Sequence, residues 1–283
     1  MSKGMSIHIG INEIDENKYG SKAKLKNPEN DASTMAGIAE AQGFDVSATL
    51  LTKEATSEHV TAALKDAASQ LTAGDILMLT YSGHGSQVPD KNGDEPDGKD
   101  ETLVLFDRQF VDDELYALFG TFPEDVRILM LSDSCHSGTV ARDLSLSLNE
   151  ATLERAFDTS KPAEARARVR ALPSDAQFRN YQRDQTLYDS IQKSLPALDQ
   201  QEIKADVLLI SGCQDNQTAS DGTGTNGLFT QTLLRTWKNG AFQGTYSRLH
   251  RQIVKAMPAY QTPNLFQSGK STPGFLAQTP FSI

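Results

Sequence analysis

Cysteine is scarce in this chain, where only Cys135 and Cys213 occur among 283 residues. Two cysteines cannot form the disulfide framework on which small secreted proteins depend, so we expect a reduced, cytoplasmic environment. No apolar run approaches the length needed to cross a bilayer, and no signal peptide is visible around Lys3. These absences argue against a membrane protein and against a disulfide-rich secreted scaffold.

Acidic residues are absent from the last part of the chain, because all 37 Asp and Glu lie at or before Asp221. The formal net charge is −10 at pH 7. An acidic front part disfavours nucleic acid and suits a basic substrate or a cation, although solubility alone would explain the net charge equally well. We expect no nucleic-acid partner.

Two short apolar runs, at residues 76–79 and 128–131, have the length and the Gly, Asp and Pro boundaries of buried strands. Runs with helical periodicity alternate with strand-like runs along the chain, which predicts βαβ units. A hydrophobic content of 38% is enough for one large domain. We therefore predict an α/β fold with a central, mostly parallel sheet of about six strands flanked by helices.

Each of these two apolar runs leads into a small polar loop that carries a reactive residue. The first loop contains His84 and the second contains Cys135. Ligands bind at the carboxyl ends of strands in open α/β sheets, and a cysteine is nucleophilic only as a thiolate, which a nearby imidazole favours. The pattern predicts a Cys-His protease in which the amides of Gly85 and Cys135 form an oxyanion hole.

Other interpretations of these residues remain open. His136 is a second candidate for the base, although its adjacency to Cys135 normally turns its side chain away. Taken alone, a cysteine after a strand is a small buried hydrophobic residue, and a lone histidine is an ordinary loop residue. Cys213 ends another apolar run, and for it we expect inert packing.

The two loops are similar to known sequences. Residues 81–85, Tyr-Ser-Gly-His-Gly, and 133–138, Asp-Ser-Cys-His-Ser-Gly, resemble the His and Cys motifs of metacaspases in the caspase-like protease superfamily. About 50 residues separate the two motifs, as in caspases. The resemblance continues at residues 30–32, 97–101, 112–115, 210–217 and 261–264. With no Pro-rich or zinc-finger prodomain in view, the chain resembles a compact bacterial orthocaspase.

The resemblance implies one caspase-like domain over residues 1–283. Residues 1–153 correspond to the large-subunit region and 205–283 to the small-subunit region, and the polar stretch 154–204 is an insert or linker outside the core. Because this insert has few large apolar residues, we expect it to be exposed and open to proteolysis. Self-processing is expected there, after one of its basic residues. The candidates are Lys161, Arg166, Arg168 and Arg170.

Metacaspases prefer Arg or Lys before the cleaved bond, and by resemblance Asp31 and Asp133 line the acidic S1 pocket. A carboxylate pairs bidentately with a guanidinium, which agrees with that role. The structural alternative makes Asp31 a helix cap and Asp133 a turn former.

Many metacaspases also bind regulatory calcium, and Asp100, Asp112, Asp113 and Asp143 resemble those positions, with Asp143 displaced by one residue. Several carboxylates suit Ca²⁺, although a solvated acidic face is the alternative. The stretch 90–101 matches an EF-hand loop poorly, because Glu95 replaces the required glycine. The stretch 222–227 satisfies a GxGxxG pattern without a strand before it, so we expect no nucleotide binding there.

The sequence thus predicts a monomeric thiol protease, a hydrolase that cleaves peptide or protein substrates after Arg or Lys, is stimulated by calcium and processes itself. Two alternatives stay open. A non-catalytic caspase-like scaffold or calcium-responsive interaction module is disfavoured by the presence of both His84 and Cys135. A caspase-superfamily protease of different specificity is disfavoured by Asp31 and Asp133.

Overall fold

The computed structural model describes residues 2–93, 95, 97–135, 168–195, 202–214, 217, 219–270 and 273–283. Strands are found at β1 Gly4–Gly10, β2 Asp45–Leu51, β3 Ile76–Ser82, β4 Gly85–Pro89, β5 Lys99–Val104, β6 Gln109–Val111, β7 Arg127–Asp133, β8 Asp206–Ser211 and β9 Asn264–Gly269. Helices are found at α1 Glu16–Tyr19, α2 Pro28–Ala41, α3 Ser57–Gln70, α4 Asp112–Phe119, α8 Ser174–Ser194, α9 Leu228–Trp237, α10 Tyr246–Ala256 and α11 Pro273–Leu276, with short 3₁₀ turns at Thr52–Glu54 and Lys238–Gly240. Among the described residues no helix is both long and apolar enough to span a membrane.

A six-stranded sheet in the order β2-β1-β3-β7-β8-β9 forms the centre of the molecule. All neighbouring strands in it are parallel except β8 and β9, which are antiparallel. The predicted α/β fold with a mostly parallel six-stranded sheet is therefore confirmed. Strands β3 and β7 are direct neighbours, and their register pairs Ser82 with Asp133 at the carboxyl ends.

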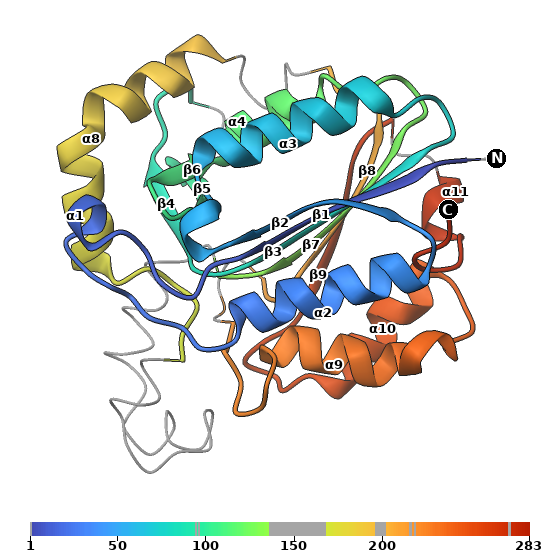
Figure 1. Ribbon diagram of the computed structural model, residues 1–283. Coiled ribbons are helices and arrows are strands. Elements are labelled where there is room, and N and C mark those ends of the chain that lie inside the picture. Colours follow the sequence, from blue (N-terminus) through green and yellow to red (C-terminus); the bar gives the residue numbers. More distant parts are fainter. Residues whose placement is uncertain are drawn as a thin grey trace.

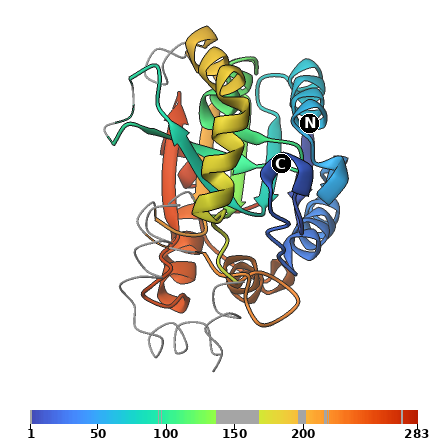
Figure 2. The ribbon, with the colours of Figure 1, turned by 90° about the vertical axis from the view of Figure 1, so that its left-hand side faces the viewer.

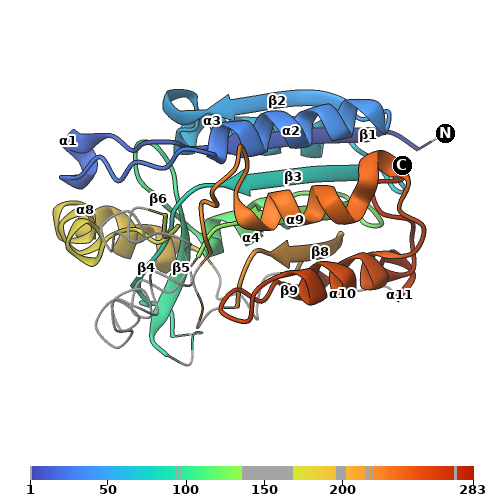
Figure 3. The ribbon, with the colours of Figure 1, turned by 90° about the horizontal axis from the view of Figure 1, so that it is seen from below.

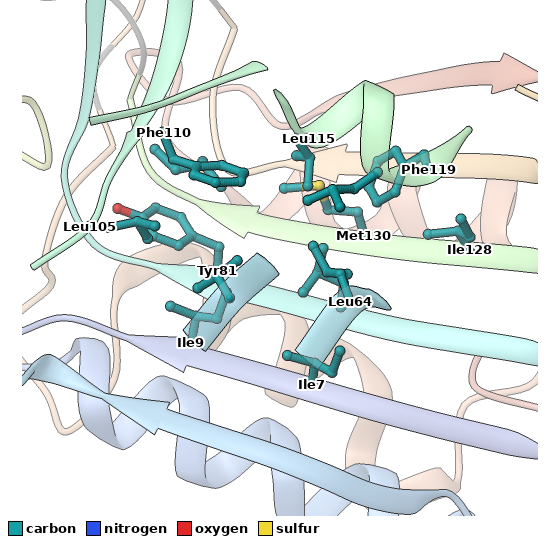
Figure 4. Close-up of a cluster of buried hydrophobic side chains, with 14 of the residues drawn as sticks. Ile7, Ile9, Leu64, Tyr81, Leu105, Phe110, Leu115, Phe119, Ile128 and Met130 are labelled. Atoms are coloured by element: carbon teal, nitrogen blue, oxygen red, sulfur yellow. The ribbon is translucent and has the colours of Figure 1, made fainter. Parts of the chain in front are cut away.

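Helices cover both faces of this sheet (Figure 1). Seen from below, α2, α9 and α10 lie across one face (Figure 3), whereas α3 and α4 lie on the other. Side chains alternate between the faces along each strand, so Leu77 and Leu79 join the α3 cluster while Ile76 and Met78 join the α2 and α9 cluster. Figure 4 shows the first cluster, in which Leu64 of α3 packs among strand residues.

A second sheet, of three antiparallel strands in the order β4-β5-β6, lies beyond the carboxyl ends of the central strands. Alternation alone does not reveal β4 and β6, because they are short and buried on nearly every residue.

Helix α8 crosses the end of the molecule beside β4 and α1, as Figure 2 shows. It belongs to the stretch 154–204, which is predicted from the sequence to lie outside the core. In the structure Leu172 and Ala176 are buried in the main hydrophobic cluster, so the expectation of an exposed insert is wrong for this part. Polar side chains attach α8 to the rest of the domain, and the helix has no continuous apolar stripe. Its burial therefore could not be predicted from composition alone.

Candidate active site

His84 lies between β3 and β4, and its ring is held from one side. Its Nε2 is 2.7 Å from the carbonyl oxygen of Ala23. Because a carbonyl only accepts hydrogen bonds, Nε2 carries the proton and Nδ1 of the neutral ring is the acceptor. Nδ1 is buried and has no hydrogen-bond partner among the described residues, so it is available to take a proton.

The charge state of His84 follows from its surroundings. Burial lowers its pKa to about 4, an effect that the contacts with the backbone of Ala23 and Ala171 only partly oppose. The imidazole is therefore neutral near pH 7. Ala23, whose carbonyl orients the ring, adopts a φ of 33°, in the left-handed region that non-glycine residues rarely occupy. Such local strain is concentrated at functional sites.

Cys135 follows the end of β7 and is completely buried. Its Sγ lies 3.5 Å from the carbonyl oxygen of Ala219, and the amide of Ala219 also contacts the sulfur. The same carbonyl accepts a 3.0 Å hydrogen bond from the amide of Arg170. The thiol therefore lies beside the backbone of Arg170.

Two backbone amides converge on the carbonyl oxygen of Arg170. The amide of Gly85 donates at 2.9 Å and the amide of Cys135 donates at 3.3 Å. Two N–H groups aimed at one carbonyl oxygen, next to a thiol, form the arrangement that stabilises an oxyanion.

The side chain of Arg170 is fully buried in a pocket of three carboxylates. Its guanidinium nitrogens lie 2.7 Å from Asp31, 3.1 Å from Asp133 and 3.0 Å from Asp221. A further hydrogen bond of 2.7 Å goes to the hydroxyl of Ser82 at the end of β3. The pocket therefore holds the guanidinium of Arg170 by charge and by hydrogen-bond geometry together.

Backbone and side-chain donors orient the two predicted pocket carboxylates. Asp31, in the first turn of α2, accepts a 2.9 Å hydrogen bond from the amide of Gly227. Asp133 accepts from both the amide and the hydroxyl of Thr230, at 3.2 and 3.0 Å. The segment before α9, which satisfies the GxGxxG pattern, thus serves as one wall of the pocket.

Burial and the neighbouring charges both shift the pKa values of the groups in this pocket. It raises the pKa of Asp133 to about 6; the charge of Arg170 lowers this pKa and the neighbouring Asp31 raises it further. Burial also disfavours the charged form of Arg170, yet the three carboxylates outweigh it and raise the pKa of the guanidinium. At neutral pH the pocket therefore holds a positive charge firmly.

The pocket has no room to spare beside the guanidinium. A Cβ on Gly227 would contact Nη2 of Arg170 and would lie 2.6 Å from Oδ2 of Asp133. A space of only about 10 Å³ remains beside Asp31 and Asp133, which is close to the volume of a single probe the size of water. The pocket is filled by Arg170.

The acidic residues predicted as metal ligands lie around the start of α4 and on β5. Carboxylate oxygens of Glu95, Glu101 and Asp112 lie within 4.8 Å of one another, the group in the described part of the chain that best fits a metal ion. They line part of a cavity of about 320 Å³. Asp100 and Asp113 are close enough to raise the pKa of Asp112, whose burial raises it most.

The family model for the caspase domain matches residues 4–281. The chain belongs to the caspase-domain family. Curated relatives include metacaspase-4 of Arabidopsis thaliana, 32% identical over 58% of this chain and 40% of the relative, and metacaspase-1 of Kluyveromyces lactis, 30% identical over 77% and 54%. The chain spans about half the length of the curated relatives it matches.

Solved structures agree with the assignment. The protein GSU0716 from Geobacter sulfurreducens is 46% identical over 99% of each chain, with a TM-score of 0.84. Caspase-1 from Spodoptera frugiperda, at 13% identity and a TM-score of 0.54, covers 95% of this chain and 86% of that one and shares the fold. The expected resemblance to metacaspases and the caspase-like fold are confirmed.

In this caspase-domain protein the predicted Gly85 and Cys135 donate to one carbonyl oxygen, that of Arg170, and His84 precedes Gly85 at the same edge of the sheet. Asp31 and Asp133 lie around one guanidinium. Asp112 belongs to a separate acidic group with Glu95 and Glu101, whereas Asp100 and Asp113 lie near this group and are not members of it. Asp143, His136, Lys161 and Arg166 lie outside the described residues.

Sequence reasoning missed three members of the site. Asp221 completes the carboxylate pocket, and its side chain accepts hydrogen bonds from the amides of residues 26–27 at 2.7 and 3.3 Å. In the sequence, Asp221 is marked only by being the last acidic residue of the chain. Ala23 acts through its backbone carbonyl, and Gly227 acts through the absence of a side chain. No sequence pattern indicates either role.

We predict that His84 is neutral, with the proton on Nε2, at every pH above about 5. Burial lowers its pKa to about 4, so protonation begins only below that range. Nitrogen-15 NMR of labelled Cys135→Ala protein distinguishes the two tautomers, and loss of the signals in the His84→Gln, Cys135→Ala protein assigns them. Titration of His84 near 6.5, or a proton on Nδ1, would contradict the geometry described here.

Proposed function

We propose that this protein is a cysteine endopeptidase that hydrolyses peptide bonds after Arg or Lys. The observation that carries this proposal is the position of Arg170, with its guanidinium among three carboxylates and its carbonyl oxygen at two amides. A peptide that enters the site in the same way presents a basic P1 side chain to the pocket and its scissile carbonyl to Cys135. The similarity to metacaspases supports the same activity.

The chemistry follows from the geometry of the side chains. The thiol of Cys135 gives its proton to Nδ1 of His84 and attacks the carbonyl carbon. The amides of Gly85 and Cys135 stabilise the oxyanion, and His84 returns the proton to the leaving amine. Water then hydrolyses the thioester, which releases the new carboxylate and restores the thiol.

We predict that purified protein cleaves peptides with Arg or Lys at P1, and that Cys135→Ala and His84→Ala each lower turnover by about 10²-fold or more. A fluorogenic peptide library with a randomised P1 position measures both effects. Preference for Asp at P1, or substantial turnover by Cys135→Ala, would contradict the proposal. No cleavage by the wild-type protein, with or without calcium, would favour the non-catalytic scaffold.

We predict that Gly227→Ala lowers kcat/KM for Arg peptides by at least about tenfold without changing any charge. The added methyl group would overlap the guanidinium site, and overpacking of this kind is costly in a filled pocket. The control is Gly37→Ala on α2, where an added Cβ meets no atom within 4 Å. Equal kcat/KM values in the two variants would show that this pocket does not hold the P1 side chain.

We also propose that Ca²⁺ stimulates the enzyme through the acidic group of Glu95, Glu101 and Asp112. Carboxylate oxygens are preferred Ca²⁺ ligands, and a cation would relieve the mutual repulsion that helps to raise the pKa of Asp112. Strand β5 links this group to the catalytic residues, because Glu101 pairs with Gln87 while Leu103 pairs with Gly85. Metal binding would thereby stabilise the strand pair that positions Gly85.

We predict that Ca²⁺ raises the melting temperature of Cys135→Ala protein, and that the further changes Glu101→Gln and Asp112→Asn abolish this rise. Because protons compete with the metal for Asp112, the rise is smaller at pH 6 than at pH 8. Differential scanning fluorimetry measures it, and Asp45→Asn, an exposed acid on the opposite edge strand β2, is the control. An unchanged calcium response in the Glu101 and Asp112 variant would refute this site.

A further inference from the structure

A cavity of about 320 Å³ lies on the face of the central sheet opposite the carboxylate pocket. Its lining residues alternate along the strands, so only one face of β7, β8 and β9 contributes to it. The register places them in two rows across the three strands, an apolar row of Met130, Leu209 and Phe266 and a polar row of Ser132, Ser211 and Asn264. The floor of the cavity is therefore apolar on one side and polar toward the carboxyl edge of the sheet.

Helix α4 forms one wall of this cavity. The residues that it contributes have the spacing i, i+3, i+4 and i+7, which places them on one face of a helix. They are Asp112, Leu115, Tyr116 and Phe119. Figure 4 shows Leu115 and Phe119 beside Met130 of the sheet. The wall is therefore apolar and aromatic except at its first residue, Asp112.

Three carboxylates also line the cavity. Glu101 on β5 and Glu95 ahead of that strand join Asp112, and their oxygens lie within 4.8 Å of one another. Phe266, which lines the cavity from the edge strand β9, is 50% exposed and is one of three exposed large apolar side chains in the described part of the chain. The cavity thus combines apolar walls, an exposed aromatic ring and a concentrated negative charge.

These features together specify the charge and the shape of a ligand. Cavities of about 300–1,000 Å³ that are mostly apolar and hold a few convergent polar groups are the usual binding sites of small molecules. A metal ion would contact the carboxylates and leave the apolar walls unfilled, and a neutral apolar molecule would gain nothing from the carboxylates. An organic cation uses both, and the rings of Tyr116 and Phe266 also attract a cation.

We propose that this cavity is a binding site for a small organic cation, an ammonium group on an aliphatic or aromatic body. The ammonium lies at the acidic group of Glu95, Glu101 and Asp112, and the body packs between α4 and the apolar row of the sheet. Binding of this ligand does not depend on the proposed peptidase activity. Where Ca²⁺ uses the same acidic group, as proposed above, the two cations compete for it.

Strand β7 connects the cavity with the catalytic residues. Ser132 lines the cavity, and its hydroxyl oxygen lies 2.9 Å from that of Ser134, the residue before Cys135. Leu131 and Asp133 alternate with the cavity residues of β7 and line the carboxylate pocket on the other face. A ligand that fills the cavity therefore packs against the strand that leads to the nucleophile.

A matched series of three probes tests the charge of the ligand. Phenylbutylamine, phenylbutanol and phenylbutyrate share one body and are cationic, neutral and anionic at about pH 7. Isothermal titration calorimetry on Cys135→Ala protein without calcium should show that the amine binds about tenfold more tightly than the alcohol, and that the butyrate binds more weakly than the alcohol. Equal affinity for the amine and the alcohol, or no binding of the amine, would overturn the proposal.

Loss of charge and loss of the aromatic ring should have different effects. Glu101→Gln with Asp112→Asn should reduce the affinity for the amine to that for the alcohol, without changing the affinity for the alcohol, and Asp45→Asn on the edge strand β2 is the control. Phe266→Ala should weaken both ligands about fivefold, because their shared body loses a ring contact. Its control is Phe178→Ala, which removes another exposed ring, on α8. Wild-type affinity for the amine in the double variant or in Phe266→Ala would overturn this site.

Methyl NMR of methionine-labelled Cys135→Ala protein locates the bound amine. Met130 lines the cavity, whereas Met78 on the neighbouring strand β3 belongs to the hydrophobic cluster on the opposite face of the sheet. Saturating amine should shift the Met130 signal and leave the Met78 signal in place, and the conservative changes Met130→Leu and Met78→Leu assign the two signals. An unshifted Met130 signal would show that the amine binds elsewhere.

Competition with calcium tests whether both cations use the acidic group. Ca²⁺ should raise the apparent dissociation constant of the amine several-fold and leave that of the alcohol unchanged. Amine binding that passes the earlier tests but is insensitive to Ca²⁺ would refute the calcium site and support the cavity. None of these measurements uses peptide cleavage, so failure of the proposed peptidase activity and failure of the cavity as a binding site are separate results.

Discussion

The interaction on which this site depends is the burial of one guanidinium among three carboxylates. Each of Asp31, Asp133 and Asp221 is at most 2% exposed, and Arg170 is fully buried. Removing one partner of a buried ion pair costs about 3–5 kcal/mol, because the remaining charge is left without compensation. An empty pocket would leave three negative charges together in a poorly solvated place. A closed pocket therefore either protonates a carboxylate or takes up a cation, and in this structure Arg170 supplies the cation.

The parallel sheet explains why charges so distant in sequence meet. Strands β3 and β7 are neighbours in register, so Ser82 and Asp133 leave the sheet side by side, and His84 and Cys135 follow them within two residues. Helix α2 returns along one face and places Asp31 at its start, close to the same edge. The pocket and the nucleophile thus come from one topological feature, which is the common carboxyl edge of parallel strands.

This edge could be predicted from the sequence because its strands are continuous apolar runs that end in reactive residues. The same pattern allowed the central sheet and the meeting of His84 with Cys135 to be anticipated. What could not be predicted depends on backbone atoms or on missing atoms. The carbonyl of Ala23 and the bare Cα of Gly227 carry no side-chain signature. Helix α8 was misplaced outside the core because polar side chains such as Asn180 dock it, and polarity was taken as exposure.

That misplacement changes the physical reason for expecting self-cleavage. An exposed, mobile segment would be cut because any protease molecule can reach it, whereas Arg170 is buried beside the Cys135 of its own chain. The contacts between Arg170 and the three carboxylates would then both favour a basic side chain and block the pocket against other substrates. A segment tethered on its α8 side is present at an effective concentration that free peptides reach only at millimolar levels. An external Arg peptide must match the contacts of Arg170 and also outcompete a ligand that never diffuses away. The attachment of α8, through contacts such as those of Asn180 and Gln177, therefore acts together with the carboxylates to hold Arg170 in the site.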